Sequence, residues 1–309
     1  MTPLNVVVVG TPAIDMMARV SALPHADGLA VAETYGAYPG GAGANVAVGV
    51  ARLGGRVGFL GTVGDDEYGR QLLRAFEEER IDTRGVRVAQ GKGSPSCFIA
   101  VGRGGERMIF ALGGEALLED ADDLEVLLLR GIRALYVTDV PTHVAAAAMA
   151  AAQEEGGFVF LSPGGLLTSG GLEPMRELLA RADAVVISQA EASCLCPTET
   201  PKQAARLLAA VGPDLVVMTL GAEGALVLDD NKISMVEAFE VQEVTDTTGA
   251  GDAFAAGLIA GFIEGLDWRQ AARLGCAVAA IKVRHLGART GLPTRRQVDD
   301  LMRRQGGAP

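Results

Sequence analysis

The chain has 309 residues, of which 49% are hydrophobic and 41 are glycine, so it can bury the core of one large α/β domain or of one domain with an insert. A formal net charge of −11 leaves no basic face for a nucleic-acid backbone, which disfavours nucleic acid as a partner. The N-terminus lacks the basic segment of a signal peptide, and no apolar run reaches the roughly 18 residues of a membrane span. We therefore expect a cytoplasmic protein without a membrane partner.

The four cysteines and three histidines are scattered along the chain without metal-ligand spacing. This pattern indicates a reduced compartment and no structural zinc.

The first predicted element is a buried parallel strand, because residues 5–10 form a β-branched run bounded by turn residues. Residues 11–38 mix polar residues, glycine and proline with short alternations, which predicts strands of a small exposed sheet. Asp15 lies just past the first strand, at the edge where α/β sheets place ligand-binding residues.

A glycine-rich turn at residues 39–45 leads into a small-residue helix predicted at 46–53. Asn45 at the helix opening offers an amide donor and a carbonyl acceptor, which suits binding of a polyol. A tight turn without a ligand is the alternative interpretation. A strand at 57–60, a turn at 61–66 and a helix ending at Glu79 are expected next.

The rest of the chain alternates strands and helices. A hairpin over residues 96–110 is expected to join the strands of residues 11–38 in one small sheet. Further strands are predicted at 134–138, 158–161, 184–187 and 215–219, a hairpin at 224–236, and helices at 143–155, 202–211, 250–264, 268–284 and 294–303. This alternation predicts an α/β fold with a parallel sheet covered by helices.

Several common catalytic motifs are absent. The chain has no Gly-x4-Gly-Lys-Ser/Thr loop and no Gly-x-Ser-x-Gly elbow, which excludes the P-loop mode of phosphate binding and argues against an α/β-hydrolase. No Gly-x-Gly-x-x-Gly follows the first strand, which disfavours a nicotinamide-dependent oxidoreductase.

Residues 246–252, Asp-Thr-Thr-Gly-Ala-Gly-Asp, lead from an extended segment through a glycine turn into an apolar helix. Such a turn lets backbone N–H groups close around a phosphate, and the helix dipole adds positive charge. Asp252 would stand beside that phosphate, where it could accept a proton from an attacking hydroxyl. A tight turn followed by an ordinary first-turn acid is the alternative.

Two other strand ends carry polar groups. Ser188 and Glu191 follow one predicted strand, either as an acid at the sheet edge or as a helix-capping box. The segment 219–224, Thr-Leu-Gly-Ala-Glu-Gly, follows another strand. Together with residues 246–252, these segments gather glycine, threonine and acid groups on one edge of the sheet.

The segments Gly40-Gly-Ala-Gly-Ala-Asn-Val-Ala47 and 246–258 resemble the two signatures of the PfkB (ribokinase-like) carbohydrate kinase family. The resemblance spans nearly the whole chain. It implies a Rossmann-like α/β core, formed by residues 1–12, 43–92 and 113–309, and a β-sheet lid, formed by residues 13–42 and 93–112. It further implies ATP as the phosphoryl donor, Mg²⁺, and a sugar-like acceptor held between lid and core.

The resemblance also implies roles for individual residues. Asp252 matches the catalytic base, and Gly249, Ala250 and Gly251 match the anion hole that stabilises the transferring group. The positions that hold the acceptor hydroxyls are Asp15, Gly40, Gly41, Asn45 and Asp139. The nucleotide positions are Ser188, Glu191, Thr219, Gly221, Gly224 and Cys276, and Glu191 also organises Mg²⁺ through water. Asp246 and Thr248, with the later turn 287–291, resemble the monovalent-cation loop of potassium-activated members.

This sequence departs from the family pattern at several of these positions. Ser188 replaces an Asn, Cys276 replaces an adenine-facing Asn, and Asp139 shortens a Glu that faces the sugar. Ala42 stands where ribokinases carry a Lys, so ribose is not assumed as the acceptor.

The leading hypothesis is ATP-dependent phosphorylation of a hydroxyl group on a pentose-like or hexose-like sugar. A nucleoside kinase is the alternative, in which an aromatic sandwich for the base would come from Tyr35, Tyr38, Phe98 or Phe110. A non-catalytic sugar-binding or nucleotide-binding protein on the same fold is a third reading, which the retained Asp252 argues against. The exposed face of the lid sheet suggests a homodimer.

Overall fold

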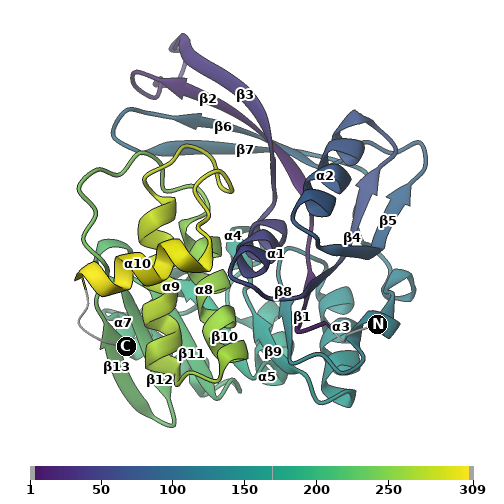
Figure 1. Cartoon of the computed structure of the whole chain (residues 1–309), viewed down its shortest axis with the longest axis vertical. Helices are drawn as coiled ribbons and strands as arrows, with labels where there is room; N and C mark the ends of the chain where they lie inside the picture. The colour runs from purple at the N-terminus through teal and green to yellow at the C-terminus, as the bar shows by residue number, and fades with distance from the viewer. Residues whose placement is uncertain (1–3, 169, 306–309) are drawn as a thin grey trace.

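The computed structural model describes residues 4–168 and 170–305. A nine-stranded sheet forms its centre, in the order β13-β12-β11-β10-β9-β8-β1-β4-β5 (Figure 1). All neighbouring strands are parallel except the edge hairpin, in which β12 runs antiparallel to β11 and to β13. The strands are β1 (Val6–Val9), β4 (Val57–Gly64), β5 (Asp82–Ala89), β8 (Ala134–Val137), β9 (Phe158–Leu161), β10 (Ala184–Ser188), β11 (Leu215–Thr219), β12 (Ala225–Asp229) and β13 (Lys232–Val236).

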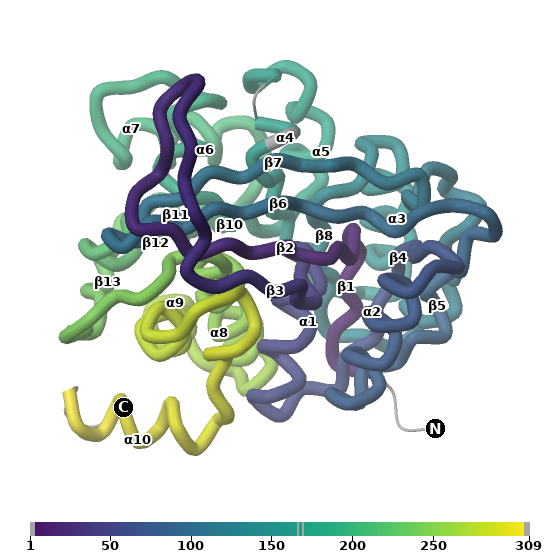
Figure 2. Tube along the Cα trace, turned by 90° about the horizontal axis from the view of Figure 1, so that it is seen from above, coloured from purple at the N-terminus to yellow at the C-terminus, as the bar shows by residue number. Residues whose placement is uncertain are grey.

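Helices cover both faces of this sheet (Figure 2). One face carries α1 (Ala42–Arg52), α2 (Glu67–Glu78), α8 (Ala250–Glu264), α9 (Trp268–Lys282) and α10 (Arg295–Gln305). The other carries α3 (Thr142–Glu154), α4 (Gly164–Thr168), α5 (Arg176–Arg181), α6 (Gln189–Leu195) and α7 (Pro201–Ala209). Short 3₁₀ turns lie at 121–123, 126–129, 173–175 and 221–223. Because both sheet faces are buried, the central strands are continuous apolar runs such as Val6–Val9.

Two glycines bring α8 and α9 into close contact. A Cβ on Gly257 would lie 2.7 Å from the Cα of Gly275, so the helix backbones meet where neither residue carries a side chain. This close contact fixes the start of α8 relative to the end of α9.

A second sheet of four strands, in the order β3-β2-β6-β7, stands above the core (Figure 1). Its strands are β2 (Ala13–Val20), β3 (Ala32–Gly40), β6 (Ser96–Val101) and β7 (Arg107–Gly113). The β2–β6 pair is parallel and the other two pairs are antiparallel. We call this sheet the lid.

The predicted α/β class and the separate small sheet are confirmed, but the boundaries predicted around β4 are wrong. The turn predicted at 61–66 is wrong, since β4 continues to Gly64. Position 61 requires glycine because a Cβ would come within 2.6 Å of the Gly10 carbonyl oxygen, and not because the chain turns. Strand β5 was missed, because it is an edge strand with charged, partly exposed residues. In the described part of the chain, no helix is long and apolar enough to span a membrane.

Candidate active site

The predicted site residues gather at one edge of the central sheet, below the lid. Asp139 follows β8, Ser188 ends β10, and Thr219 ends β11. In a parallel sheet these carboxyl ends meet at the same edge. Helix α8 begins there as well, so its first turn brings Asp252 to the same region.

Asp252 lies in the first turn of α8, after Gly249, which has φ +75°. A side chain at Gly249 would also collide with Ala288, 2.9 Å away, so this turn needs glycine. The Asn45 amide Nδ2 donates to Asp252 Oδ2 at 2.7 Å. Burial raises the pKa of Asp252 to about 6, although the Asn45 hydrogen bond and the charges of Arg107 and Lys282 oppose the shift. Asp252 is therefore ionised at neutral pH and close to the range of an effective general base.

The predicted anion hole consists of Gly249, which caps α8, and of Ala250 and Gly251, which are the first two residues of that helix. The N–H of Ala250 donates to the Thr247 carbonyl at 3.1 Å. In the described residues, the N–H groups of Gly249 and Gly251 donate no hydrogen bond, in contrast to that of Ala250. First-turn N–H groups of a helix lack intrahelical acceptors, so the two glycine amides are the better donors for an anion.

Arg289 connects the glycine turn of α1 to Asp252. Its Nε donates to Asn45 Oδ1 at 2.8 Å and its Nη2 to the Gly40 carbonyl at 2.5 Å. Because the Asn45 oxygen is taken by Arg289, the amide nitrogen must face Asp252, which fixes the orientation of the Asn45 side chain. Arg52 in turn donates to the Arg289 carbonyl at 3.1 Å and pairs with Glu79. A chain of polar contacts thus runs from Glu79 to the carboxylate of Asp252.

The predicted acceptor residues form one cluster around Asp252. Asp15 on β2 is 6% exposed, and burial raises its pKa to about 6 against the opposing charge of Arg289. A Cβ on Gly40 would lie 2.1 Å from Asp15 Oδ2, so glycine there makes room for the carboxylate. Gly41 has φ +90° and faces the Thr11 carbonyl.

Asp139 occupies a strained position at the end of β8. Its φ of +51° is uncommon for a residue with a side chain. Burial, together with the negative charges of Asp252 and Glu191, raises the pKa of Asp139 to about 7. Strained backbone and shifted carboxyls both occur preferentially at functional sites.

The predicted nucleotide residues are less closely connected. Ser188 and Glu191 form the capping box of α6, in which the Ser188 hydroxyl and backbone N–H both donate to Glu191 Oε2. The capping box that the sequence offered as one interpretation of this pair is therefore present. Ser188 pairs in register with Thr219 on β11, which places the two strand ends side by side.

Two glycines and Cys276 complete this set. Gly221 has φ +61° and Gly224 has φ +96°, where a Cβ would lie 2.0 Å from the Val236 carbonyl oxygen. Cys276 is buried on α9, and burial raises the pKa of its thiol to about 11. No hydrogen bond in the described residues joins Gly224 or Cys276 to Thr219.

Asp246 and Thr248 lie in the segment that enters the anion-hole turn. Asp246 Oδ1 accepts the N–H of Thr248 and Oδ2 accepts the N–H of Gly287, each at 2.8 Å. The carbonyl of Asp246 accepts a hydrogen bond from the ammonium of Lys282 at 2.9 Å. All the oxygens that Asp246 could offer to K⁺ therefore already accept hydrogen bonds, so this donor set fits a bound K⁺ poorly.

A dedicated Mg²⁺ cage is absent, since no cluster of three or more His, Cys, Asp or Glu side chains among residues 4–168 and 170–305 could hold a metal ion. Glu191 keeps its Oε1 free of the capping hydrogen bonds. Mg²⁺ commonly binds through substrate phosphates, waters and one or two carboxylates, and Glu191 fits that mode.

Three residues near Asp252 were not recognised from the sequence as part of the site: Arg107, Lys282 and Arg289. Lys282 carried a usable signal, because it interrupts the apolar stretch 277–283. Arg289 lies within the turn 287–291, which resembles part of the monovalent-cation loop. Arg107 on β7 lies close enough to lower the pKa of Asp15 and Asp252, and nothing in the local sequence indicates that.

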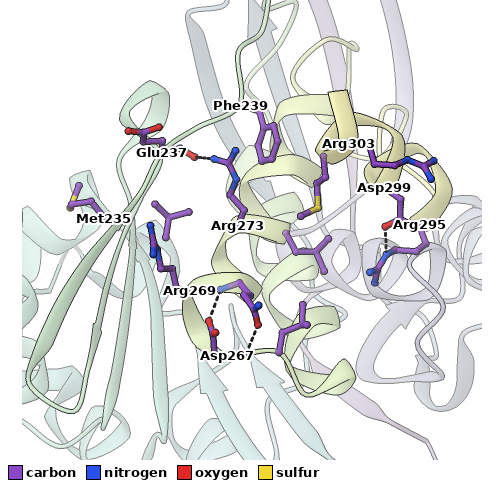
Figure 3. Close-up of a pocket in the computed structure, with 14 residues that line it drawn as sticks. Met235, Glu237, Phe239, Asp267, Arg269, Arg273, Arg295, Asp299 and Arg303 are labelled. Carbon is purple, nitrogen blue, oxygen red and sulfur yellow. Dashed lines mark hydrogen bonds and ion pairs between the residues drawn. The ribbon is translucent and has the colours of Figure 1, made fainter. Parts of the chain in front are cut away.

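A cavity of about 920 Å³ lies away from these residues, between β13, α9 and α10 (Figure 3). Within it, Arg273 lies over the ring of Phe239 and donates to the Glu237 carbonyl, and Arg295 pairs with Asp299. None of the predicted site residues lines this cavity.

Known proteins resemble this chain over nearly its full length. A ribokinase of Haemophilus influenzae is 30% identical over 280 residues, which cover 87% of this chain and 89% of that protein. A probable chloroplastic fructokinase-6 of Arabidopsis thaliana is 30% identical over 321 residues, covering 96% and 82%. The solved structure of Arabidopsis thaliana ribokinase complexed with ribose and ATP superposes with a TM-score of 0.85 at 25% identity, over 97% of this chain and 99% of that one.

These structural likenesses confirm the ribokinase-like fold. The sequence profile of the family described as pfkB family carbohydrate kinase matches residues 3–295. The chain therefore belongs to the pfkB family of carbohydrate kinases and is a phosphotransferase.

Proposed function

We propose that this protein transfers the γ-phosphoryl group of ATP to a hydroxyl group of a pentose-like or hexose-like sugar. One observation carries the proposal: Asp252 stands at the start of α8, held by Asn45, and faces a cluster with Asp15 and Asp139. A carboxylate beside an anion-binding turn is unfavourable unless it takes a proton during the reaction.

In the proposed reaction, the acceptor oxygen forms a bond to the γ-phosphorus while the bond to the β,γ-bridging oxygen breaks. Asp252 takes the proton of the acceptor hydroxyl, and ADP leaves with the electron pair of the broken bond. The N–H groups of Gly249 and Gly251 and the N-terminus of α8 stabilise the charge on the transferring group. Asn45 holds Asp252 in place through the hydrogen bond at 2.7 Å.

The acceptor hydroxyls are proposed to bind Asp15, Asn45, Asp139 and the backbone at Gly40 and Gly41. Carboxylate and amide groups suit a polyol, because they accept and donate hydrogen bonds in fixed directions.

The register of the lid favours a sugar over a nucleoside. Side chains at alternate strand positions face opposite sides of a sheet, and Asp15 pairs with Tyr38. Tyr35, Phe98 and Phe110 occupy positions of the opposite parity, so they lie on the other face of the lid. Of the four aromatic residues considered for a base sandwich, Tyr38 alone shares the face of Asp15.

ATP is proposed to lie along Thr219, Gly221, Gly224 and Cys276, with Ser188 and Glu191 beside its phosphates. The Arabidopsis thaliana ribokinase complexed with ATP supports this donor. Mg²⁺, when bound, would neutralise phosphate charge, and Glu191 would hold it through water. The predicted cytoplasmic location agrees with the use of ATP and stays a prediction.

We further propose that residues 13–42 and 93–112 act as a lid over a core formed by the remaining residues, and that two lids pair in a homodimer. The outer lid face exposes Tyr35, Met108 and Phe110 by 66%, 42% and 54%. A second copy would cover this aromatic face with an identical one. Phe110→Glu should then halve the mass measured by sedimentation.

A coupled assay of ADP release over a panel of pentoses, hexoses and nucleosides, with Mg²⁺ and ATP, tests the acceptor class. The proposal expects turnover that requires a free sugar. If only nucleosides support turnover, the acceptor is a nucleoside and not a sugar. If the protein binds nucleotide but phosphorylates no acceptor, the non-catalytic alternative is favoured.

A further inference from the structure

Lys282 is a fully buried lysine that the proposed reaction does not use. It lies in the last turn of α9 and is 0% exposed. Its ammonium donates to the Asp246 carbonyl at 2.9 Å. A buried ammonium is costly unless negative charge and hydrogen-bond acceptors compensate it, so its position needs a reason.

The compensating charge is Asp246, which is also 0% exposed. Its two carboxylate oxygens accept hydrogen bonds from the neutral N–H groups of Thr248 and Gly287. Such donors orient the carboxylate but leave its charge unbalanced, and a buried anion needs a cation nearby. Lys282 supplies that positive charge from the last turn of α9, where its ammonium donates to the backbone carbonyl of the same aspartate.

The loop of Asp246 is also held on the end of α9 by its backbone. The N–H groups of Thr245 and Asp246 both donate to the Val283 carbonyl, at 2.8 and 3.1 Å. Three residues after Asp246 the chain reaches Gly249 and the start of α8. The ammonium and Val283 therefore fix the segment that positions the anion-binding turn.

A bound K⁺ would occupy the same region, beside Asp246 and Thr248. Hard cations surround themselves with about six or more oxygens. Here the oxygens of Asp246 already accept hydrogen bonds, and in the described residues Thr248 Oγ1 is the one buried side-chain oxygen of this segment without a partner. A second cation would also meet the charge of Lys282 in a region from which water is excluded.

We propose that the ammonium of Lys282 takes the place of a monovalent metal ion at the 245–248 segment, so that this protein needs no K⁺ for phosphoryl transfer. The activity part of this inference rests on the proposed kinase function. The ion-binding part does not, because it concerns the stability of the folded protein.

The experiment compares the wild type with Lys282→Met, which keeps the length of the side chain and removes its charge. Lys202→Met, an exposed lysine on α7, is the matched control. Thermal unfolding and sugar-dependent ADP release are measured in KCl and in tetramethylammonium chloride at equal ionic strength, since the larger cation cannot enter the site.

For the wild type and Lys202→Met, we expect the same unfolding midpoint in both salts and turnover that changes less than about twofold. For Lys282→Met, K⁺ should raise the midpoint by about 2–4 °C or more, because an ion that binds only the folded state stabilises it. Turnover of this variant should be about tenfold lower without K⁺ and partly restored by it, as expected when a lost charge is replaced.

A wild type that K⁺ stabilises or activates about tenfold over tetramethylammonium overturns the proposal, whatever the variants do. If Lys282→Met does not fold, Asp246→Asn combined with Lys282→Met removes both charges and is expected to fold without responding to K⁺. If K⁺ raises the unfolding midpoint of the double variant by the amount expected for Lys282→Met alone, that result also contradicts the proposal. If no acceptor supports turnover, the proposed kinase function fails, and the unfolding midpoints still decide whether K⁺ binds.

Discussion

The proposed site has an acceptor half and a nucleotide half, and these two halves are built differently. The acceptor half joins Asp252, Asn45 and Arg289 through hydrogen bonds between segments far apart in the sequence. It also holds three carboxyl groups with raised pKa values, of which Asp15 is buried and Asp139 and Asp252 are half-buried. The nucleotide half consists of separate strand-end turns, and the pair formed there by Ser188 and Glu191 serves the cap of its own helix.

This difference suggests that the acceptor half is organised before any ligand binds, whereas the nucleotide half depends on ATP to connect its parts. Preorganised polar groups lose little freedom when the substrate arrives, so their removal should lower the rate of the reaction. Changes in the nucleotide half should mostly weaken ATP binding. Single substitutions in each half distinguish these two outcomes.

Asp252→Asn should lower kcat by about 10³-fold, because the amide cannot take the proton of the acceptor hydroxyl. The dissociation constant of ATP should stay within about threefold of the wild type, since the nucleotide half is untouched. Steady-state kinetics and calorimetric ATP titration check the two values, with the exposed Asp229→Asn as control. Undiminished turnover in Asp252→Asn would refute the mechanism.

Arg289→Met should lower kcat about thirtyfold, or about 2 kcal/mol, because Asn45 loses the donor that fixes its amide toward Asp252. Arg289→Lys keeps the charge but cannot donate to both Asn45 and Gly40, so it should recover only part of the rate. Kinetic constants are measured beside unfolding midpoints, with the exposed Arg296→Met as control. A rise in the KM for ATP with unchanged kcat would contradict this role.

The value of kcat/KM for the sugar should fall about tenfold per pH unit below about pH 6, because Asp252 has a pKa raised to about 6 and is inactive when protonated. Asp15 titrates in the same range, so the profile of Asp15→Asn is the control. If Asp252 is the base, the acid limb persists in Asp15→Asn. A flat profile between pH 5 and pH 7 would argue against a carboxylate base.

Asp139→Asn should weaken sugar binding about tenfold and stabilise the protein at pH 8 by about 2 kcal/mol. The pKa of Asp139 is raised from 3.8 to about 7, so the ionisation of this carboxyl opposes folding. The cost is complete above pH 7 and declines steadily as the pH falls from 7 towards the ordinary pKa, so it is smaller at pH 5 than at pH 8. Asn tolerates the positive φ of this position. Urea unfolding at pH 8 and pH 5 measures the difference, and Asp230→Asn, an exposed residue with φ +45°, is the control. An equal effect at both pH values would mean that charge is not the cause.

Ser188→Ala should have the smallest effect, a rise of about threefold in the KM for ATP with kcat unchanged. It removes the hydroxyl that accepts the Glu191 N–H and donates to Glu191 Oε2, and loss of such a helix cap typically costs about 1 kcal/mol. Ser193→Ala, on the exposed side of the same helix, is the matched control for kinetics with varied ATP. A drop in kcat as large as that of Arg289→Met would erase the distinction between the two halves.

The sequence allowed the elements with strong local patterns to be predicted. Helix α8 and strands β9 and β11 have the predicted bounds, because continuous apolar runs between turn residues identify them. Strand β5 was missed, since an edge strand with charged residues lacks that pattern. Side-chain contacts of Arg289 and Lys282 could not be predicted, because they join positions whose distance is set only by folding. The resemblance to a family pointed to Asp252 and Asn45, and no local pattern would have paired them.

The fate of the γ-phosphoryl group, followed by ³¹P NMR with and without a sugar that supports ADP release, shows whether Asp252 activates a sugar hydroxyl or water. Asp252 is proposed to activate the acceptor hydroxyl, so we expect one phosphorylated sugar for each ADP and almost no inorganic phosphate when the sugar is omitted. Release of inorganic phosphate at the same rate with and without sugar would contradict it, because the site would then activate water.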